Sequence, residues 1–137
     1  MGMFKRGPVL VVEDEPSIRE LLCDAFEQEG LEVVAASEGE QAIRIAKDRR
    51  PALVLLDMGL PIIDGAEVAD AIRDAYGDSV PFVVVTASRR IEDAAARIGA
   101  ARYFTKPFDV PELVRAVRAA LETPPPVSET ASVEPAR

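Results

Sequence analysis

The sequence predicts an α/β protein with a doubly wound (βα)5 architecture, in which one five-stranded parallel sheet is covered by helices on both faces. Two observations support this prediction. Short, apolar, β-branched runs recur along the chain, which is typical of parallel strands that are buried on both faces. The segments between these runs have the apolar spacing of amphipathic helices, as right-handed crossover connections require.

The first strand is expected at Val9–Val12, and the first helix follows it. Pro16 suits the first position of a helix, because the amide hydrogen that proline lacks has no helical partner there. The apolar stripe of this helix is expected to comprise Ile18, Leu21, Leu22, Ala25 and Phe26. Gly30 should end the helix and lead into a second strand over 31–36.

The second helix is expected to begin at Ser37. Ser37 with Glu40 three residues later has the pattern of a capping box, in which two side chains bind the first free amide groups of a helix. This helix should run through Arg49, until Pro51 breaks it. The third strand is then expected over 53–56.

Asp64 and Glu67 repeat the capping-box pattern at the start of a third helix. The apolar stripe of that helix is expected to comprise Val68, Ile72, Ala75 and Tyr76. After a fourth strand over 82–85, an Ala-rich helix ends at Gly99. Its apolar positions are Ile91, Ala94, Ala95 and Ile98. Because small side chains bury little area, this fourth helix should be the least firmly held.

The last two elements are a strand around Tyr103 and Phe104 and a helix started by Asp109, Pro111 and Glu112. The core side of this helix is expected to comprise Leu113, Val114, Val117 and Leu121. From 122 to 137 the chain is rich in Pro, Ser and Glu and has neither helical nor strand periodicity. We therefore expect a folded domain over 8–121 and a disordered tail or linker over 122–137.

Composition narrows the possible functions. The 137 residues are 48% hydrophobic, which is enough for one globular core. There is no histidine, which removes His-based catalysis and the commonest zinc ligand. The net charge of −8 argues against direct nucleic-acid binding. Neither a signal peptide nor an apolar run of roughly 20 residues is present, so a cytoplasmic domain without membrane contact is expected.

Polar residues follow four of the predicted strands. Glu13 and Asp14 follow the first strand, Asp57 the third, Thr86 the fourth and Lys106 the fifth. Ligands of open parallel sheets bind beyond the carboxyl ends of the strands, so these side chains should share one pocket. Three converging carboxylates repel one another, which favours a cation such as Mg²⁺. The arrangement suits a carboxylate that accepts a phosphoryl group.

Four motifs in this chain resemble those of the response-regulator receiver domain of two-component signalling. They are Glu13-Asp14-Glu15-Pro16, Asp57-Met58-Gly59-Leu60-Pro61 with Asp64-Gly65, Thr86-Ala87, and Lys106-Pro107-Phe108. The resemblance covers about residues 8–121. It implies a flavodoxin-like fold with strand order 2-1-3-4-5. It also implies phosphorylation of Asp57 by a histidine kinase or a histidine phosphotransfer protein.

The resemblance assigns a role to each pocket residue. The implied Mg²⁺ ligands are Asp14, Asp57, the backbone carbonyl of Gly59 and, through water, Glu13. The groups implied to bind phosphoryl oxygens are the Thr86 hydroxyl, the Ala87 backbone N–H and Lys106. Tyr103 matches an aromatic residue that swings inward when the threonine moves. The peptide bond before Pro107 is cis in this family.

Output is expected on the face made by the fourth helix, the fifth strand and the fifth helix. Residues 89–118 include seven basic and four acidic residues, and this excess of positive charge favours an acidic protein partner there. The bases expected to mark this face are Arg89, Arg90, Arg102, Arg115 and Arg118. In the winged-helix transcription factors of this family, two acidic residues at the positions of Ala101 and Arg102 form salt bridges across a dimer. We therefore expect a monomer or a weak dimer.

Other functions stay open. The chain could be a phosphate-shuttling phosphorelay intermediate, or a receiver-shaped scaffold that works without phosphorylation, although intact Asp57, Thr86 and Lys106 argue against the scaffold. A phosphatase of the haloacid-dehalogenase type needs a second Asp where Gly59 stands. A dinucleotide-binding fold lacks its G-x-G-x-x-G motif. We expect no enzyme activity beyond self-directed phosphotransfer and autodephosphorylation.

Overall fold

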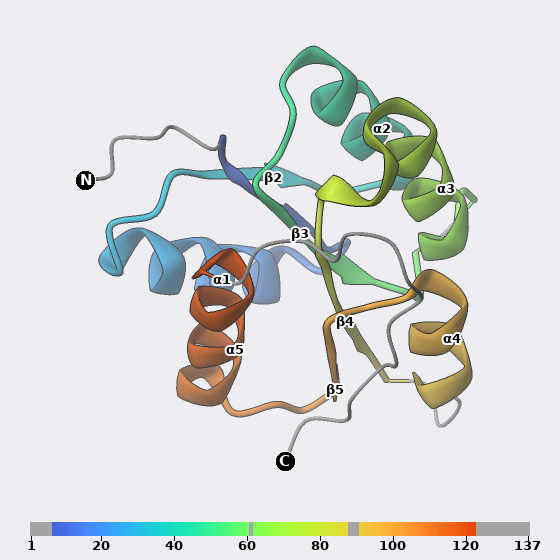
Figure 1. The fold of residues 1–137 in the computed structure, drawn as a ribbon. Helices are drawn as coiled ribbons and strands as arrows, with labels where there is room; N and C mark the ends of the chain where they lie inside the picture. The colour runs from blue at the N-terminus through green and yellow to red at the C-terminus, as the bar shows by residue number, and fades with distance from the viewer. Residues whose placement is uncertain (1–6, 61, 88–90, 123–137) are drawn as a thin grey trace.

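The computed structural model describes residues 7–60, 62–87 and 91–122. In this part of the chain, strands and helices alternate, and the sheet is wholly parallel (Figure 1). The strand order is β2-β1-β3-β4-β5. The predicted fold class and the implied strand order are therefore confirmed.

The bounds of the elements are as follows. The strands are β1 (Val9–Val12), β2 (Val33–Ala36), β3 (Leu53–Asp57), β4 (Phe82–Thr86) and β5 (Arg102–Thr105). The α-helices are α1 (Pro16–Gln28), α2 (Gly39–Asp48), α3 (Gly65–Tyr76), α4 (Ile91–Ile98) and α5 (Val110–Glu122). A short 3-10 helix, η1 (Gly77–Ser79), follows α3. None of the described helices combines the length and the apolar character that a membrane crossing requires.

Helices cover both faces of the sheet (Figure 1), and a hydrophobic core lies on each side of it. Successive side chains of a strand point to opposite faces, so Leu10 and Val12 of β1 pack with α2, α3 and α4, while Val9 and Val11 pack with α1 and α5. All four of these side chains are buried. Because neither face of the central strands meets water, their sequences are uniformly apolar, and polar groups can stand only where the strands end.

Two predicted helical stripes are wrong at one residue each. Leu21 is 50% exposed, whereas Leu22 is fully buried. One residue turns a helix by about 100°, which takes Leu21 off the side of α1 that faces the sheet. In α3, Ala69 is buried beside Val68, and Ala75 is exposed. The other side chains predicted for these two stripes are buried or half-buried.

The start of α2 also differs from the prediction. The residue that caps this helix is Glu38, and its side chain makes no capping hydrogen bond. Instead, Gln41 Oε1 accepts hydrogen bonds from the Ser37 backbone N–H at 2.8 Å and from the Ser37 hydroxyl at 3.2 Å. The Ser37–Glu40 capping box is therefore wrong, because a glutamine one residue further on reaches the same turn. The second strand begins at Val33, two residues later than predicted, because the Leu31 N–H is bound to the carbonyl of Phe26 at the end of α1.

The capping box of α3 is confirmed. Glu67 N–H donates to Asp64 Oδ1 at 3.0 Å, and Asp64 N–H donates to Glu67 Oε1 at 3.2 Å. The third helix thus starts immediately after the loop that follows β3.

Removing this cap should destabilise the protein. We expect Asp64→Ala to lower the free energy of unfolding by about 1 kcal/mol, because it leaves the first turn of α3 without its side-chain acceptor. Glu38→Ala is the matched control, since Glu38 holds the same position in α2 but accepts no capping hydrogen bond. Urea unfolding of both variants measures the difference. Equal losses in the two variants would show that the box seen at Asp64 contributes nothing.

The remaining predicted elements agree with the structure. Ala95 and Ile98 are buried in α4, and the side chains of Ile91 and Ala94 lie outside the described part. On α5, Leu113 and Val117 are buried. The predicted tail over 122–137 lies outside the described residues except for Glu122, which ends α5.

Candidate functional site

The predicted site residues meet at one edge of the sheet. The register pairs Val12 of β1 with Leu56 of β3, and Asp57 with Val85 of β4. Glu13, Asp57 and Thr86 therefore come at the carboxyl ends of three neighbouring strands. All three side chains are nearly inaccessible to solvent, with exposed fractions of 1%, 4% and 2%.

Lys106 joins two of the acids. Its Nζ lies 3.1 Å from Glu13 Oε2 and 3.1 Å from Asp57 Oδ2. Burial lowers the pKa of Lys106, but the hydrogen bonds to Glu13 and Asp57 outweigh this effect and raise it. The ammonium group therefore stays protonated, and its positive charge lies between two buried carboxyl groups.

Glu13 is the most constrained of the acids. Its Oε2 accepts hydrogen bonds from Lys106 and, at 3.2 Å, from the Glu15 backbone N–H. Its Oε1 is buried and has no hydrogen-bond partner among the described residues. Burial raises the pKa of Glu13 to about 7, and repulsion by Asp57 adds to the rise, while Lys106 opposes it. An acid in this state gains from any additional cation near its free oxygen.

The three acids form a cluster that fits a metal ion. Carboxylate oxygens of Glu13, Asp14 and Asp57 lie within 4.8 Å of one another. Asp14 is exposed, whereas the other two are buried, so the cluster opens to solvent on one side. Hard oxygen ligands with room for water are what Mg²⁺ takes in proteins, and the free Oε1 of Glu13 supplies a further acceptor.

The loop after β3 holds Asp57 in place. The Gly59 backbone N–H donates to Asp57 Oδ1 at 2.9 Å, and the Met58 N–H donates to the carbonyl of Val85 at 3.1 Å. Gly65 lets α3 approach this loop, because a Cβ at that position would lie 2.6 Å from Met58 Sδ. The role of the Gly59 carbonyl as a metal ligand stays a prediction.

The ends of β4 and β5 are tied together. The Lys106 backbone N–H donates to the carbonyl of Thr86 at 3.0 Å, and Thr86 pairs with Thr105 in the sheet. The peptide bond between Lys106 and Pro107 is cis, as the resemblance implies. Thr86 is thus placed beside the lysine segment, and Ala87 follows it at the mouth of the site. Phosphoryl binding by Thr86 and Ala87 stays a prediction.

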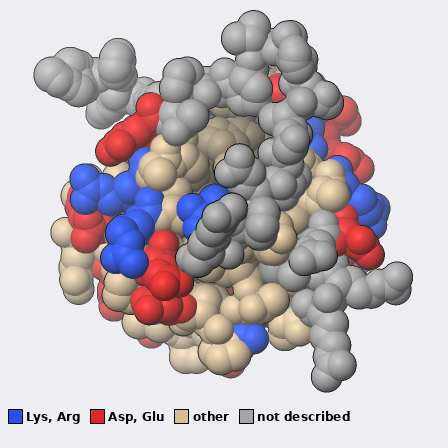
Figure 2. Space-filling model, turned by 60° about the horizontal axis from the view of Figure 1, so that its bottom comes forward, with Lys and Arg blue, Asp and Glu red and all other residues tan. Residues whose placement is uncertain are grey.

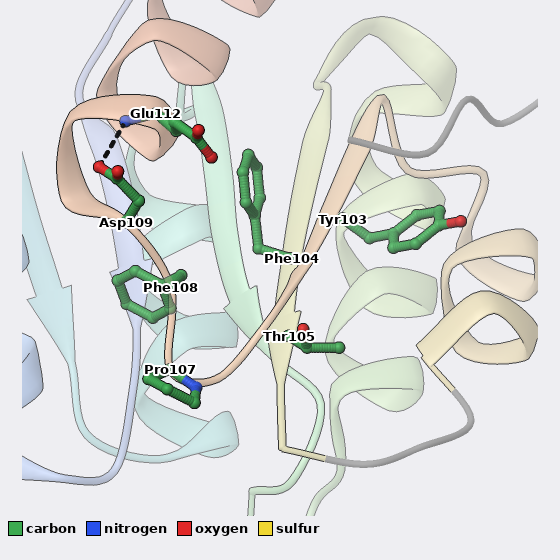
Figure 3. A pocket seen from close by; sticks show the side chains of 7 residues that line it. All are labelled: Tyr103, Phe104, Thr105, Pro107, Phe108, Asp109 and Glu112. Atoms are coloured by element: carbon green, nitrogen blue, oxygen red, sulfur yellow. Dashed lines mark hydrogen bonds between the residues drawn. The ribbon is translucent and has the colours of Figure 1, made fainter. Parts of the chain in front are cut away.

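Tyr103 is half-buried against the core that α2, α3 and α4 form. Figure 3 shows its ring on the opposite side of β5 from Phe104, directed toward α4. This position is compatible with the inward movement that the resemblance implies, and that movement stays a prediction.

The sequence analysis missed one residue of the site. Arg19, on the first turn of α1, donates from Nη1 to the backbone carbonyl of Glu13 at 3.0 Å. Its guanidinium therefore braces the loop that carries Glu13 and Asp14. The signal in the sequence is a basic residue one helical turn after Glu15, and the apolar periodicity of α1 does not include it.

The bases expected on the output face are spread more widely than predicted. Arg118 Nη1 pairs with Glu29 Oε1 at 2.6 Å, so this residue faces α1 and not α4. Arg102 is half-buried, with its guanidinium 5.5 Å from the centre of the Phe104 ring. Arg89 and Arg90 lie outside the described residues. On the face in Figure 2, acidic and basic side chains lie directly beside one another, so the described residues make no uniformly charged patch there.

The fold and the cluster of acids beside a half-buried lysine are typical of receiver domains. The family model for the response regulator receiver domain matches residues 9–118. The chain therefore belongs to the response regulator receiver domain family of two-component systems.

Similar proteins fall into two groups. The chain is 37% identical over 133 residues to the transcriptional regulatory protein PrrA of Mycobacterium tuberculosis, which covers 93% of this chain and 57% of PrrA. It is 35% identical over 112 residues to the sporulation initiation phosphotransferase F of Bacillus subtilis, covering 80% of this chain and 90% of that protein. The chain thus spans about half the length of the curated transcriptional regulators that it matches.

Solved structures agree with the fold and the family. The response regulator protein TrrA from Thermotoga maritima, in complex with Mg(2+)-BeF, is 36% identical with a TM-score of 0.74, and the match covers 83% of this chain and 98% of that chain. The receiver domain of NtrX from Brucella abortus is 34% identical with a TM-score of 0.77, and the match covers 84% and 98% of the two chains.

Proposed function

We propose that this chain is a phosphorylation-switched receiver in which Asp57 accepts a phosphoryl group from a histidine kinase or a histidine phosphotransfer protein. The observation that carries the proposal is the setting of the Asp57 carboxylate. It is buried at the end of β3, with one oxygen held by the Gly59 N–H and the other 3.1 Å from Lys106 Nζ. A carboxylate fixed in this way presents a nucleophile next to a cation that can bind an incoming anion.

The acids would hold Mg²⁺ through Asp14, Asp57 and the Gly59 carbonyl, with Glu13 acting through water. Bound Mg²⁺ offsets the repulsion between the carboxylate and the phosphoryl oxygens. Arg19 keeps the loop with Asp14 in position through the carbonyl of Glu13.

Transfer forms a bond between an Asp57 oxygen and phosphorus, and it breaks the bond between phosphorus and the donor nitrogen. The new anion attracts Lys106, which at rest is shared between Glu13 and Asp57. The Thr86 hydroxyl and the Ala87 N–H would bind the remaining phosphoryl oxygens. On this proposal, the chemistry stays confined to the protein's own Asp57, as phosphotransfer and autodephosphorylation.

This proposal is tested with a small phosphodonor. Acetyl phosphate with Mg²⁺ should add one phosphoryl group to the protein, measured by intact mass, and EDTA should prevent the addition. The modification should be removed by hydroxylamine, as an acyl phosphate is. A protein that stays unmodified under conditions that modify a known receiver would refute the proposal.

The metal ligands can be tested separately from phosphorylation. We expect Asp14→Asn to weaken Mg²⁺ binding more than Glu13→Gln, because the first residue is proposed to touch the ion and the second to act through water. Titration of Mg²⁺ followed by amide chemical shifts measures both affinities. Equal losses in the two variants, or none, would show that this set of ligands is wrong.

Output is proposed to pass through the α4-β5-α5 face to a protein partner. Lys106 and Thr86 are joined through the backbone at the ends of β5 and β4, so a phosphoryl group that draws them inward would move both strand ends. The Ala-rich α4 is the element expected to respond, by a shift between states that already exist. The protein is taken to act in the cytoplasm as a monomer or weak dimer. The absence of direct nucleic-acid binding stays a prediction, since the matched PrrA proteins are named transcriptional regulators.

Beryllofluoride, a phosphoryl mimic, provides the readout for output. We expect large amide shift changes at the site and between Thr86 and Arg118, with small changes in α1 and α2. Measurement requires ¹⁵N spectra with and without the mimic. If the changes end at the site, the protein binds the mimic without switching this face.

A phosphorelay intermediate is the second candidate function. It is favoured by the similarity to sporulation initiation phosphotransferase F, 90% of which the match covers. A relay intermediate should pass its phosphoryl group on to a histidine phosphotransfer domain, whereas a terminal receiver should lose it to water. Radiolabelled transfer from the phosphorylated chain to a panel of such domains separates the two.

A further inference from the structure

We propose that a cavity between β5 and α5 binds a segment of the downstream protein in which one large apolar side chain is flanked by Lys or Arg. The inference rests on the proposed function in one respect, namely that the α4-β5-α5 face is where the partner docks. It specifies that the docking segment of the partner is basic, whereas the sequence favoured an acidic partner.

The cavity has an apolar floor. Its volume is about 260 Å³, and Phe104, Pro107 and Phe108 contribute to its lining. Figure 3 shows the two phenyl rings and the proline around the hollow. Phe104 is only 7% exposed and forms the base, while Phe108 is half-buried. Pockets for cofactor-sized ligands measure roughly 300–1,000 Å³, so this smaller cavity suits one side chain of a peptide.

Its rim is acidic. Asp109 and Glu112 are the charged residues among those that line the cavity, and both are exposed. Asp109 Oδ1 accepts the Glu112 backbone N–H at 3.3 Å, which accounts for one oxygen as a helix cap. Neither carboxylate forms an ion pair with any residue that the structure describes. The rim therefore offers negative charge above an apolar floor.

The bases nearby do not neutralise this rim. Arg102 on β5 has its guanidinium on the Phe104 ring, and Arg115 on α5 makes no ion pair with Glu112 among the described residues. Lys106 lies in the chain between Thr105 and Pro107, which both line the cavity, but its ammonium group is held by Glu13 and Asp57. A cation from a partner would therefore meet Asp109 and Glu112 without a competitor already bound to them.

The acidic rim disfavours two other possible occupants of the cavity, namely a second copy of this chain and residues 123–137 of the chain itself. A second copy of this chain carries a net charge of −8, which an acidic rim repels. Residues 123–137 include two Glu and a single Arg, so the chain's own end does not supply an apolar side chain between two bases. A separate, basic segment matches the cavity better than either.

The backbone beside the cavity favours an extended segment. Among the residues that the structure describes, the sheet ends at β5, and none of their strands covers its outer side. A peptide that lies along an edge strand places alternate side chains on one face. One apolar side chain would therefore enter the cavity, and the side chains two residues before and after it would lie at the rim.

Two matched peptides test the inference on the 137-residue chain. The first is acetyl-Lys-Gly-Phe-Gly-Lys-amide, in which both Lys share a face with Phe when the peptide is extended, and in the second both Lys are replaced by Glu. Titration into ¹⁵N-labelled protein should shift amides between Phe104 and Glu112, and the Lys peptide should bind about tenfold more tightly. Equal affinity for the two peptides, or shifts elsewhere on the surface, would overturn the inference.

Substitutions on α5 test whether the attraction comes from the rim of the cavity or from the net charge of the protein. Glu112→Gln should weaken the Lys peptide several-fold, and Glu112→Lys should reverse the preference between the two peptides. Glu122→Gln, which removes one charge from the last residue of the same helix, should change neither affinity. If Glu122→Gln weakens binding as much as Glu112→Gln, the attraction comes from net charge and the cavity is not the site.

Two further outcomes distinguish the alternatives. Truncation after Glu122 should leave peptide affinity unchanged, and a gain on truncation would show that the chain's own end fills the cavity. Concentration-dependent shifts at the cavity without peptide would assign it to a second copy. Phosphorylation by acetyl phosphate, measured on the same samples, should be normal in Glu112→Gln. If phosphorylation is normal and peptide preference is absent, the inference fails and the proposed function stands.

Discussion

Asp57→Asn should abolish phosphorylation of the protein by acetyl phosphate. The carboxamide has the shape of the carboxylate, so the Gly59 N–H can still donate to its oxygen. It carries no charge, however, and an amide oxygen is too weak a nucleophile to attack phosphorus at a useful rate. We expect no detectable phosphoprotein by intact mass, and no modified peptide around β3 after digestion.

The control for this substitution is Asp74→Asn, an exposed acid on α3 that lies outside the acidic cluster. It should be phosphorylated like the unmodified sequence. Circular dichroism should show that Asp57→Asn is folded, since Lys106 keeps its ion pair with Glu13. Phosphorylation that persists unchanged in Asp57→Asn would place the acceptor on another residue.

The metal-free protein should lose stability as the pH rises from 4.5 to about 7. Burial and the negative charge of Asp57 raise the pKa of Glu13 from 4.5 to about 7, although Lys106 acts in the opposite direction. An acid with a raised pKa holds its proton more tightly when folded, so stability is fully present below about pH 4.5 and declines as the pH approaches 7. The shift corresponds to a loss of about 3 kcal/mol.

Urea unfolding in EDTA, at several pH values, measures this decline. Glu13→Gln removes the titrating group and should flatten the profile, whereas Glu40→Gln, an exposed acid on α2, should retain it. The raised pKa of Lys106 acts in a different range, because its contribution is complete at neutral pH and is lost only when lysine deprotonates. A profile that falls equally in Glu13→Gln would assign the effect to other groups.

The sequence was sufficient for the features that depend on periodicity. Apolar runs specify buried parallel strands, and the residues after them specify what meets at one edge of the sheet. Glu13, Asp57, Thr86 and Lys106 could therefore be brought together before any coordinates were known. The order of the strands required the family resemblance, because periodicity does not say which strands are neighbours.

Features that depend on local competition were not predictable. Gln41 and Glu40 are both able to bind near the start of α2, and only the conformation of the turn selects the former. Arg118 could face the output surface or α1, and the nearby Glu29 decides it. The acidic cavity combines Phe104 with Glu112, which no spacing rule relates.

The ion pairs of Lys106 with Glu13 and Asp57 also have a consequence for the folding of the chain. Lys106 contacts Asp57 across 49 positions in the sequence and Glu13 across 93. Contacts of such long sequence separation form late, because large loops must close before they can be made. A chain that has assembled only its first three strands contains Asp57 but has no bound cation from β5 beside it. On the proposed function, Asp57 would therefore accept phosphate only after the whole sheet has formed, and a chain truncated before β5 should not be phosphorylated by acetyl phosphate.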